Sequence, residues 1–479
     1  MSTRQQIRTA SLWSLLSEAA VRVVTPFVFL ILARLLTPED FGLVATAMIV
    51  VSLAQLIGDG GMSRALVQSV GDTVATANTV FWMNLALGFV LYIILFLLAD
   101  LAATPFGDPR AAGIIQIQGL QVILMPFVSV HKAVFQKGLD FRPLFKLQLV
   151  AAVVPGLISV PFAIYGMGYW ALVWGSLIAT LVQAVVVWRR SSWRPRFRFD
   201  RKIASNLLGF SAWTSGQSII TWFYQWGDTF FVGIFLTSVA MGLYRTGSAL
   251  IIFVFAVAIA PLQPVLFSAF SRLQNDLPSL GEALAKANKA IAMVSLPIAT
   301  LVFVFRDAAE LLIFTEQWQG IAPVIGWAAL TQGMAWTVGS NAQAYSAAGR
   351  PDVTLKLNLV LLCIYIPIYW LAIQQDIETF LKARFALTLA AIPVHLYIAR
   401  RLFGTSMLNF FDQIKWSLVA SASLALAILF LSSLVVPESS LFAYGLIGFA
   451  GIFVYVLLMW REWPFAIDLL GLTPDSKTE

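Results

Sequence analysis

The chain is a series of long, nearly continuous apolar segments separated by short polar connections. A helix needs about 20 mostly apolar residues to cross the roughly 30 Å of bilayer hydrocarbon. The pattern predicts fourteen such helices, at about 11–35, 38–58, 78–99, 112–134, 144–165, 168–188, 206–236, 238–270, 286–305, 320–346, 353–373, 378–399, 413–435 and 441–460. Transmembrane β-strands are excluded because they alternate apolar and polar residues over about ten positions. The hydropathy pattern therefore predicts an all-α integral membrane protein.

The first segment is predicted to stay in place as a helix rather than to be cleaved as a signal peptide. Glu18 and Arg22 interrupt it, and it is longer than the apolar part of a signal peptide. Composition agrees with a lipid-facing chain, since 11% of its residues are charged against roughly 25% in soluble proteins. The chain has one cysteine, Cys363, and two histidines, His131 and His395, which argues against a His/Cys metal site or a Cys/His nucleophile. We expect no enzyme activity and no cofactor.

Basic residues are concentrated on one side of the predicted helices. With the N-terminus in the cytoplasm, the outer side would hold only Arg34, Arg110, Arg306, Lys382 and Arg384 of the 31 Lys and Arg residues. Cytoplasmic loops carry such an excess of positive charge. The distribution predicts that both termini are cytoplasmic in a bacterial inner membrane, and it explains the net charge of +7 without nucleic acid.

The most basic connection, at about 189–204, reads Arg-Arg-Ser-Ser-Trp-Arg-Pro-Arg-Phe-Arg-Phe-Asp-Arg-Lys in its first fourteen positions. One interpretation is a cytoplasmic anchor and linker whose aromatic residues lie among the lipid headgroups. The other is a docking strip for an anionic lipid or for the phosphate end of a lipid substrate.

An internal repeat divides the chain. Leu36–Leu43 (LTPEDFGL) matches Leu236–Leu243 (LTSVAMGL), Lys146–Val150 matches Lys356–Val360, and Arg189-Arg190 matches Arg400-Arg401. Six helices per repeat give both halves the same orientation, as in parallel-repeat transporters. The repeat predicts a six-helix bundle at 1–190, a basic linker at 191–204, a second bundle at 205–401 facing the first around a central cavity, and two extra helices with a tail at 402–479. Within the first hairpin, Thr37, Pro38 and Asp40 predict a capped helix start.

Several motifs resemble those of a known family. The stretch Ala33–Leu43 (ARLLTPEDFGL), followed by Asp59–Ser63 (DGGMS), resembles bacterial polysaccharide flippases of the multidrug/oligosaccharidyl-lipid/polysaccharide exporter superfamily. Gln136–Arg142 (QKGLDFR) and Gly242-Leu243-Tyr244 resemble the branch that exports colanic acid and succinoglycan. The resemblance implies a V-shaped pair of bundles that moves polyprenyl-pyrophosphate-linked oligosaccharide to the outer leaflet. It also implies that the first, second, seventh and eighth helices line a central cleft.

Ionisable residues inside the predicted helices are the candidate site. A charge costs about 2.5–3.5 kcal/mol at a helix centre even on lenient scales, so it usually faces a wet cavity or a partner. Arg22 and Arg245 are predicted to bind the pyrophosphate, because a guanidinium meets phosphate oxygens in a bidentate way. Glu18 lies one turn from Arg22, so an ion pair within the helix is the alternative for these two.

Three acids, Glu18 among them, and several polar or aromatic residues complete the prediction. Glu18, Asp59 and Asp228 are candidates for ion coupling or for pairing with the arginines, and Asp228 could pair with Arg245 across its hairpin. Gln217, Gln225 and Trp222 are candidate sugar contacts. The aromatic residues of this segment, Trp213, Trp222, Tyr224 and Trp226, could instead face lipid.

Other functions stay open at this level. A multidrug exporter of the same superfamily would carry organic cations, and two arginines inside the membrane argue against it. A polysaccharide polymerase would need a sizeable outer loop, which the pattern does not contain. No P-loop is present, so a Na+ or H+ gradient, the membrane potential or product removal would supply energy. The expected partners are the lipid-linked substrate, membrane lipids and polysaccharide polymerase machinery, with the chain itself a monomer.

Overall fold

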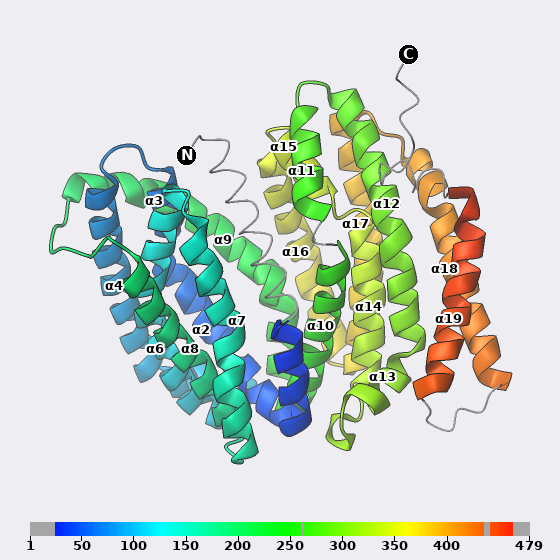
Figure 1. Ribbon diagram of the computed structural model, residues 1–479, viewed down its shortest axis with the longest axis horizontal. Coiled ribbons are helices and arrows are strands. Elements are labelled where there is room, and N and C mark those ends of the chain that lie inside the picture. Colours follow the sequence, from blue (N-terminus) through cyan, green and yellow to red (C-terminus); the bar gives the residue numbers. More distant parts are fainter. Residues whose placement is uncertain (1–23, 260–261, 435–440, 463–479) are drawn as a thin grey trace. The chain divides into compact units, whose positions relative to one another are not determined.

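The computed structural model describes residues 24–259, 262–434 and 441–462 (Figure 1). The chain forms two compact units, and the boundary between them in the sequence lies between Thr246 and Gly247. Throughout the described ranges the regular structure is helical. The predicted all-α membrane architecture is therefore confirmed.

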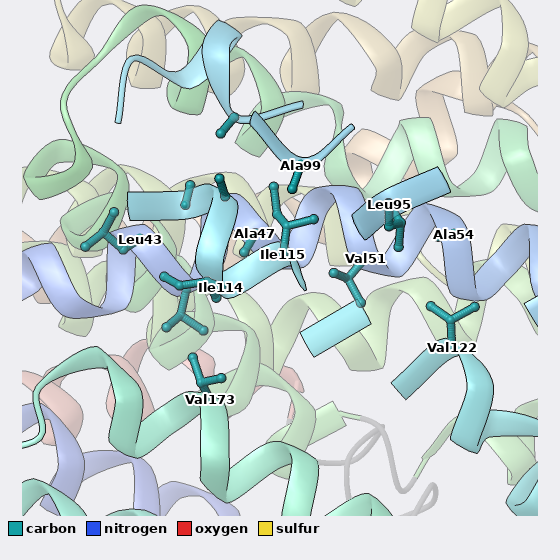
Figure 2. Close-up of a cluster of buried hydrophobic side chains, with 14 residues drawn as sticks. Leu43, Ala47, Val51, Ala54, Leu95, Ala99, Ile114, Ile115, Val122 and Val173 are labelled. Atoms are coloured by element: carbon teal, nitrogen blue, oxygen red, sulfur yellow. The ribbon is translucent and has the colours of Figure 1, made fainter. Parts of the chain in front are cut away.

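The first unit contains a helix at Val24–Leu35 and the elements α2 to α9, together with the start of α10. Their bounds are α2 Pro38–Asp59, α3 Met62–Gln68, α4 Thr73–Leu97, α5 Ala99–Ala103, η1 Thr104–Phe106, α6 Arg110–Lys137, α7 Phe141–Ile164, α8 Tyr169–Arg190, α9 Arg201–Phe235 and α10 Ser238–Ile259. The core of this unit lies where α2 packs against α6, and Figure 2 shows its small and branched side chains, with Val173 of α8 alongside.

The second unit contains the rest of α10 and the remaining elements. These are α11 Leu262–Arg272, α12 Leu277–Val304, α13 Arg306–Ile313, η2 Glu316–Trp318, α14 Ala322–Trp336, α15 Asn341–Ala347, α16 Pro351–Ile373, α17 Ile377–Phe403, α18 Met407–Leu434, α19 Leu441–Leu458 and η3 Met459–Glu462. Helix α12 is central to this unit, because α14, α17 and α18 all pack against it.

Eleven helices in the described ranges are long and apolar enough to cross a membrane. The other three predicted segments differ in length or polarity. The segment 11–35 lies partly outside the described residues, and Val24–Leu35 is its described part. Helix α9 covers 206–236, but polar residues such as Gln217 and Asp228 lower its hydropathy. The segment 320–346 is divided between α14, which has 15 residues, and the short α15.

The repeat seen in the sequence extends to the order of the elements. A long helix, a short helix, a long helix, a short helix and a single 3-10 turn follow one another as α2, α3, α4, α5 and η1, and again as α10, α11, α12, α13 and η2. Helices α7 and α8 then correspond to α16 and α17. The division of the chain at 191–204, and the central cavity, stay predictions.

The predicted helix start at Thr37 is confirmed. The Thr37 hydroxyl oxygen accepts a hydrogen bond from the backbone N–H of Asp40 at 3.2 Å, and the Asp40 carboxylate accepts one from the N–H of Thr37 at 2.9 Å. This reciprocal capping box satisfies donors that a helix N-terminus would otherwise leave unpaired. Pro38 occupies the first turn, where its missing N–H costs nothing.

In the first unit, the loops that connect the helices make polar contacts with one another at two opposite ends of the helices. At one end Glu39 pairs with Arg110, and the Ser238 hydroxyl donates to Asp108 at 3.1 Å. At the other end the Lys137 ammonium donates to the Ser69 carbonyl at 2.8 Å. The loops in the first group are those predicted to lie on the outer side of the membrane, and those in the second group are predicted to lie on the cytoplasmic side. Loops predicted to share a side thus lie at the same end of the unit.

Candidate functional site

Arg245 of α10 is held against an aromatic stack of α9. Its guanidinium carbon lies 4.3 Å from the centroid of the Trp226 ring. The Trp226 and Trp222 rings are nearly parallel, with centroids 6.5 Å apart and an interplanar angle of 18°. A cation over an indole face is worth about 2 kcal/mol or more when it is desolvated. The aromatic stack thus offsets part of the cost of placing this half-buried charge in a predicted membrane span.

The stack is anchored to α2 by one hydrogen bond. The Trp222 indole N–H donates to the Ser52 hydroxyl at 3.0 Å, and the Trp222 side chain is 6% exposed. Ser52, Trp222, Trp226 and Arg245 therefore form a continuous chain of contacts across α2, α9 and α10, here called the arginine–tryptophan cluster. All four residues belong to the first unit.

Asp228 lies on α9 and accepts several hydrogen bonds. The Tyr244 hydroxyl, one residue before Arg245, donates to its carboxylate at 2.7 Å. Thr229 donates to it from its backbone N–H at 2.6 Å and from its hydroxyl at 3.1 Å. Hydrogen bonds to a carboxylate offset the loss of its hydration. The predicted pairing of Asp228 with Arg245 stays a prediction.

Asp59 belongs to a different part of the first unit. It ends α2, where Gly60 and Gly61 turn the chain with positive φ values of 52° and 70°. Its carboxylate accepts from the hydroxyl of Ser63 and, at 3.5 Å, from the amide of Asn84 on α4. Two helical turns separate it from Ser52, or about 10 Å along the axis. The structure therefore does not bring Asp59 into the arginine–tryptophan cluster.

The other predicted site residues fall into three groups. Gln225 and Tyr224 are exposed and Gln217 is half-buried, so their roles as sugar contacts or lipid-facing groups stay predictions. Trp222 uses its N–H within the protein, and a sugar contact for it also stays a prediction. Arg22 and Glu18 lie outside the described residues, as does the side chain of Trp213.

The sequence did not single out Ser52 and Tyr244. Hydroxyl side chains are common in membrane helices and usually bond to their own backbone or to a neighbouring helix, so Ser52 carries no signal by itself. Tyr244 lies inside the Gly242-Leu243-Tyr244 motif and next to Arg245. That position was the one available hint of a role near the charge.

A second buried polar cluster lies in the other unit. The Asn288 amide donates to the Asn341 carbonyl oxygen at 3.0 Å, and the Tyr345 hydroxyl donates to the backbone carbonyl of His395 at 3.2 Å. Asn288 and Asn341 line a pocket of about 440 Å³ between α12, α17 and α18. The lining is mixed, with amides such as Asn409 and Gln413 beside apolar side chains such as Leu396 and Phe410. No group of three or more metal-ligating side chains occurs among the residues that the structure describes.

The end of the first unit that is predicted to face outward has its own charge network. Asp108 accepts from the Arg110 guanidinium at 2.8 Å and from the Ser238 hydroxyl at 3.1 Å. Hydrogen bonding to Arg110 is the main reason that the pKa of Asp108 lies below its usual value, with burial acting in the opposite direction. The network connects the corner before α6 to the turn between α9 and α10.

Comparison with known proteins places the chain in a family of polysaccharide biosynthesis proteins. The sequence pattern of a family described as "Polysaccharide biosynthesis protein" matches residues 31–323, more than half of the chain. The succinoglycan biosynthesis transport protein ExoT of Rhizobium meliloti is 27% identical over 67% of this chain and 65% of its own length, so the match spans just under two thirds of that relative. The lipopolysaccharide biosynthesis protein WzxC of Escherichia coli is 24% identical over 77% of this chain and 75% of its own.

Two solved structures share the fold. The lipid II flippase MurJ, in an inward closed conformation, has a TM-score of 0.76 at 13% identity over 96% of this chain and 99% of its own. An inward-facing multidrug resistance transporter of the MATE family has a TM-score of 0.61 at 15% identity over 80% of this chain and 96% of its own. At these identities the likeness establishes the fold and leaves the cargo open.

Proposed function

The chain belongs to the family of polysaccharide biosynthesis proteins, and on that premise we propose that it is a lipid-linked oligosaccharide flippase. It moves polyprenyl-pyrophosphate-linked repeat units from the cytoplasmic to the outer leaflet by alternating access, for exopolysaccharide or lipopolysaccharide assembly. The name of the ExoT relative, a succinoglycan transport protein, supports transport rather than an enzyme reaction. The proposed location is the bacterial inner membrane, with both termini in the cytoplasm.

The observation that carries the proposal is the position of Arg245. Arg245 lies within the candidate membrane span of α10, and its guanidinium packs on the Trp226 ring. A guanidinium is a planar, permanently charged fork that meets phosphate oxygens in a bidentate way. Such a group suits a doubly charged pyrophosphate, and Arg22 would supply the second cation. Asp228 and Asp59 are then candidates for coupling to a Na+ or H+ gradient.

The second candidate is a multidrug exporter, because one of the solved structures with this fold is such a transporter. An exporter of organic cations would be opposed by a fixed positive charge in the transport path, since like charges repel strongly where water is excluded. Arg245 therefore favours an anionic cargo over a cationic one.

The deciding experiment uses cells of the source organism that lack the protein. We would measure the amount and leaflet location of lipid-linked oligosaccharide together with surface polysaccharide. Complete repeat units that accumulate on the cytoplasmic leaflet, with polymer missing outside, are expected for a flippase. Unchanged lipid-linked sugars combined with new sensitivity to cationic drugs would reject the proposal in favour of drug export.

A variant series connects that result to the cluster. Arg245→Ala should fail to restore polymer although it is present in the membrane in normal amount, and Arg245→Lys should restore it only in part. Lys415→Ala is the matched control, because Lys415 is an exposed cation that pairs only with Asp412 among the described residues. Full restoration by Arg245→Ala would remove the arginine from the proposed mechanism.

A further inference from the structure

The connection between α8 and α9 is pinned to the first unit. This segment, residues 191–200, is here called the strap. The backbone N–H of Arg196 donates to the Asn78 side-chain carbonyl at 3.0 Å, and the Arg196 carbonyl accepts from the Trp82 indole at 2.8 Å. The Phe197 ring stacks on Trp82, with centroids 4.5 Å apart. The strap therefore has a defined path over the N-terminal part of α4.

Trp193 anchors the other end of the strap. It is 7% exposed and packs in the cluster that contains Phe81 and Val130. Its neighbours in sequence remain outside, because the arginine side chains at 189, 190, 194, 196 and 198 are all exposed. The strap and the end of α8 thus present these cations on the protein surface, at the end predicted to be cytoplasmic.

An apolar groove of about 480 Å³ lies beside two of these cations. It is lined by Phe127 of α6, by Ala184, Val185 and Trp188 of α8, and by Arg189 and Arg194. Val185 is 50% exposed, so the groove is accessible from the surface.

Arg194 is oriented before any ligand arrives. Its Nη1 donates to the backbone carbonyls of Ser191 and, at 2.8 Å, of Trp193. Its guanidinium carbon lies 5.6 Å from the centroid of the Trp188 ring. Nε and Nη2 donate to no residue in the described ranges. These two nitrogens form the edge that binds an oxyanion in a bidentate way.

We propose that this groove is a binding site for an anionic glycerophospholipid of the cytoplasmic leaflet. Arg189 and Arg194 bind the phosphate of the headgroup, and a hydrocarbon chain lies along Phe127, Ala184 and Val185. The two arginines match the anionic headgroup of such a lipid, and the apolar lining matches its hydrocarbon chain. The lining contains no hydroxyl, amide or carboxylate side chain, so it offers no side-chain acceptor for the hydroxyl protons of a sugar. The site is thus distinct from the proposed oligosaccharide site and does not depend on it.

The test measures lipid retention by the purified, delipidated full chain in native mass spectrometry. The lipids are phosphatidylglycerol, phosphatidylcholine with the same acyl chains, and a polyprenyl diphosphate. Phosphatidylglycerol should be retained most strongly. The double variant Arg189→Gln/Arg194→Gln should weaken its binding about tenfold or more, since each basic residue near a headgroup contributes on the order of a factor of five.

Two further variants separate a site from general attraction. Arg198→Gln/Arg201→Gln removes the same charge from exposed positions outside the groove and should retain phosphatidylglycerol almost as well as the wild type. Val185→Trp fills the groove without changing the charge and should lose the lipid. Because Val185 is half exposed, this replacement should not disturb folding, and circular dichroism would check it.

Three outcomes would overturn the proposal. Equal weakening in both charge variants would mean that the strap attracts anions without a site. Unchanged retention in Val185→Trp would mean that the groove is not occupied. Preferential retention of the polyprenyl diphosphate would assign the groove to the transported lipid instead.

Discussion

Gly42 and Gly242 pack reciprocally at the crossing of α2 and α10. A Cβ atom added to Gly42 would lie 1.7 Å from the backbone carbonyl oxygen of Ser238, and one added to Gly242 would lie 1.7 Å from that of Pro38. The two glycines are 200 positions apart, as are Pro38 and Ser238. The two copies of the sequence repeat thus contact each other, and the glycine of each hairpin leaves room for a backbone carbonyl of the other.

This crossing predicts the effect of adding one methyl group. Gly42→Ala or Gly242→Ala forces two backbones apart, and overpacking of this kind costs about 1–3 kcal/mol or more. We expect a lower melting temperature of the purified protein and reduced transport. Gly216→Ala is the control, because no described atom lies within 4 Å of the added Cβ and alanine favours a helix. Equal melting temperatures for the three variants would contradict the close crossing.

A second prediction concerns the anchor of the arginine–tryptophan cluster. Ser52→Ala leaves the buried Trp222 indole N–H without its acceptor, which should lower the free energy of unfolding by about 1–3 kcal/mol. Trp222→Phe removes the donor as well, and the double variant should be less destabilised than the sum of the two single ones. A double-mutant cycle on thermal stability measures this coupling, expected to be at least about 0.5 kcal/mol for contacting residues. Strict additivity would show that the hydrogen bond is not made.

A third prediction separates the charge of Arg245 from its shape. In reconstituted vesicles, Arg245→Lys keeps the charge but loses the planar fork and its stacking on Trp226. Transport of the lipid-linked oligosaccharide should fall about tenfold or more, the equivalent of one charge-assisted hydrogen bond. Trp226→Phe retains an aromatic face and should cause a smaller loss. If the lysine variant transports at the wild-type rate, a simple positive charge is sufficient.

Acid should loosen the contact between Asp108 and the turn at Ser238. The pKa of the Asp108 carboxyl is below its ordinary value in the folded protein, chiefly because Arg110 donates to it. A depressed pKa stabilises the fold above the ordinary value near 4, and that stability is lost as the pH falls through the folded value. Asp108→Asn should therefore flatten the acidic side of a plot of melting temperature against pH and cost up to about 1 kcal/mol at neutral pH. Parallel curves for the two proteins would contradict this role.

The predicted sidedness can be tested with single cysteines. Cys363 is first replaced by Ser. Two single-cysteine proteins are then made from this variant, Asp140→Cys and Gln375→Cys, both at exposed positions. We expect an impermeant maleimide added to whole cells to label residue 375 and to reach residue 140 only after the membrane is opened. The reversed pattern would place both termini outside and would invert the proposed direction of transport.

Much of the candidate site could be recognised from the sequence because charges are costly in lipid. Arg245 and Asp228 stood out for that reason, and the tryptophans of α9 stood out by their number. The Asp59 prediction shows the limit of this approach. The free-energy cost of a charge in the membrane draws attention to a charged residue. It does not say whether that residue lies near Arg245 or, as Asp59 does, beside Ser63 and Asn84.

The sequence by itself determined most of the helices, their alternation, the cap at Thr37 and the repeat, although it joined α14 and α15 into one segment. These follow from segment length, from hydropathy and from residues within one turn of each other. Only the tertiary structure decided that Arg245 rests on Trp226, that Trp222 bonds to Ser52, and that the strap is pinned to α4. Ser52 and Trp222 are 170 residues apart, and the helix faces that meet are equally apolar. An apolar helix face is equally stable against lipid and against another helix, so the hydropathy pattern does not specify which helices touch. Close packing of individual side chains determines the contacts.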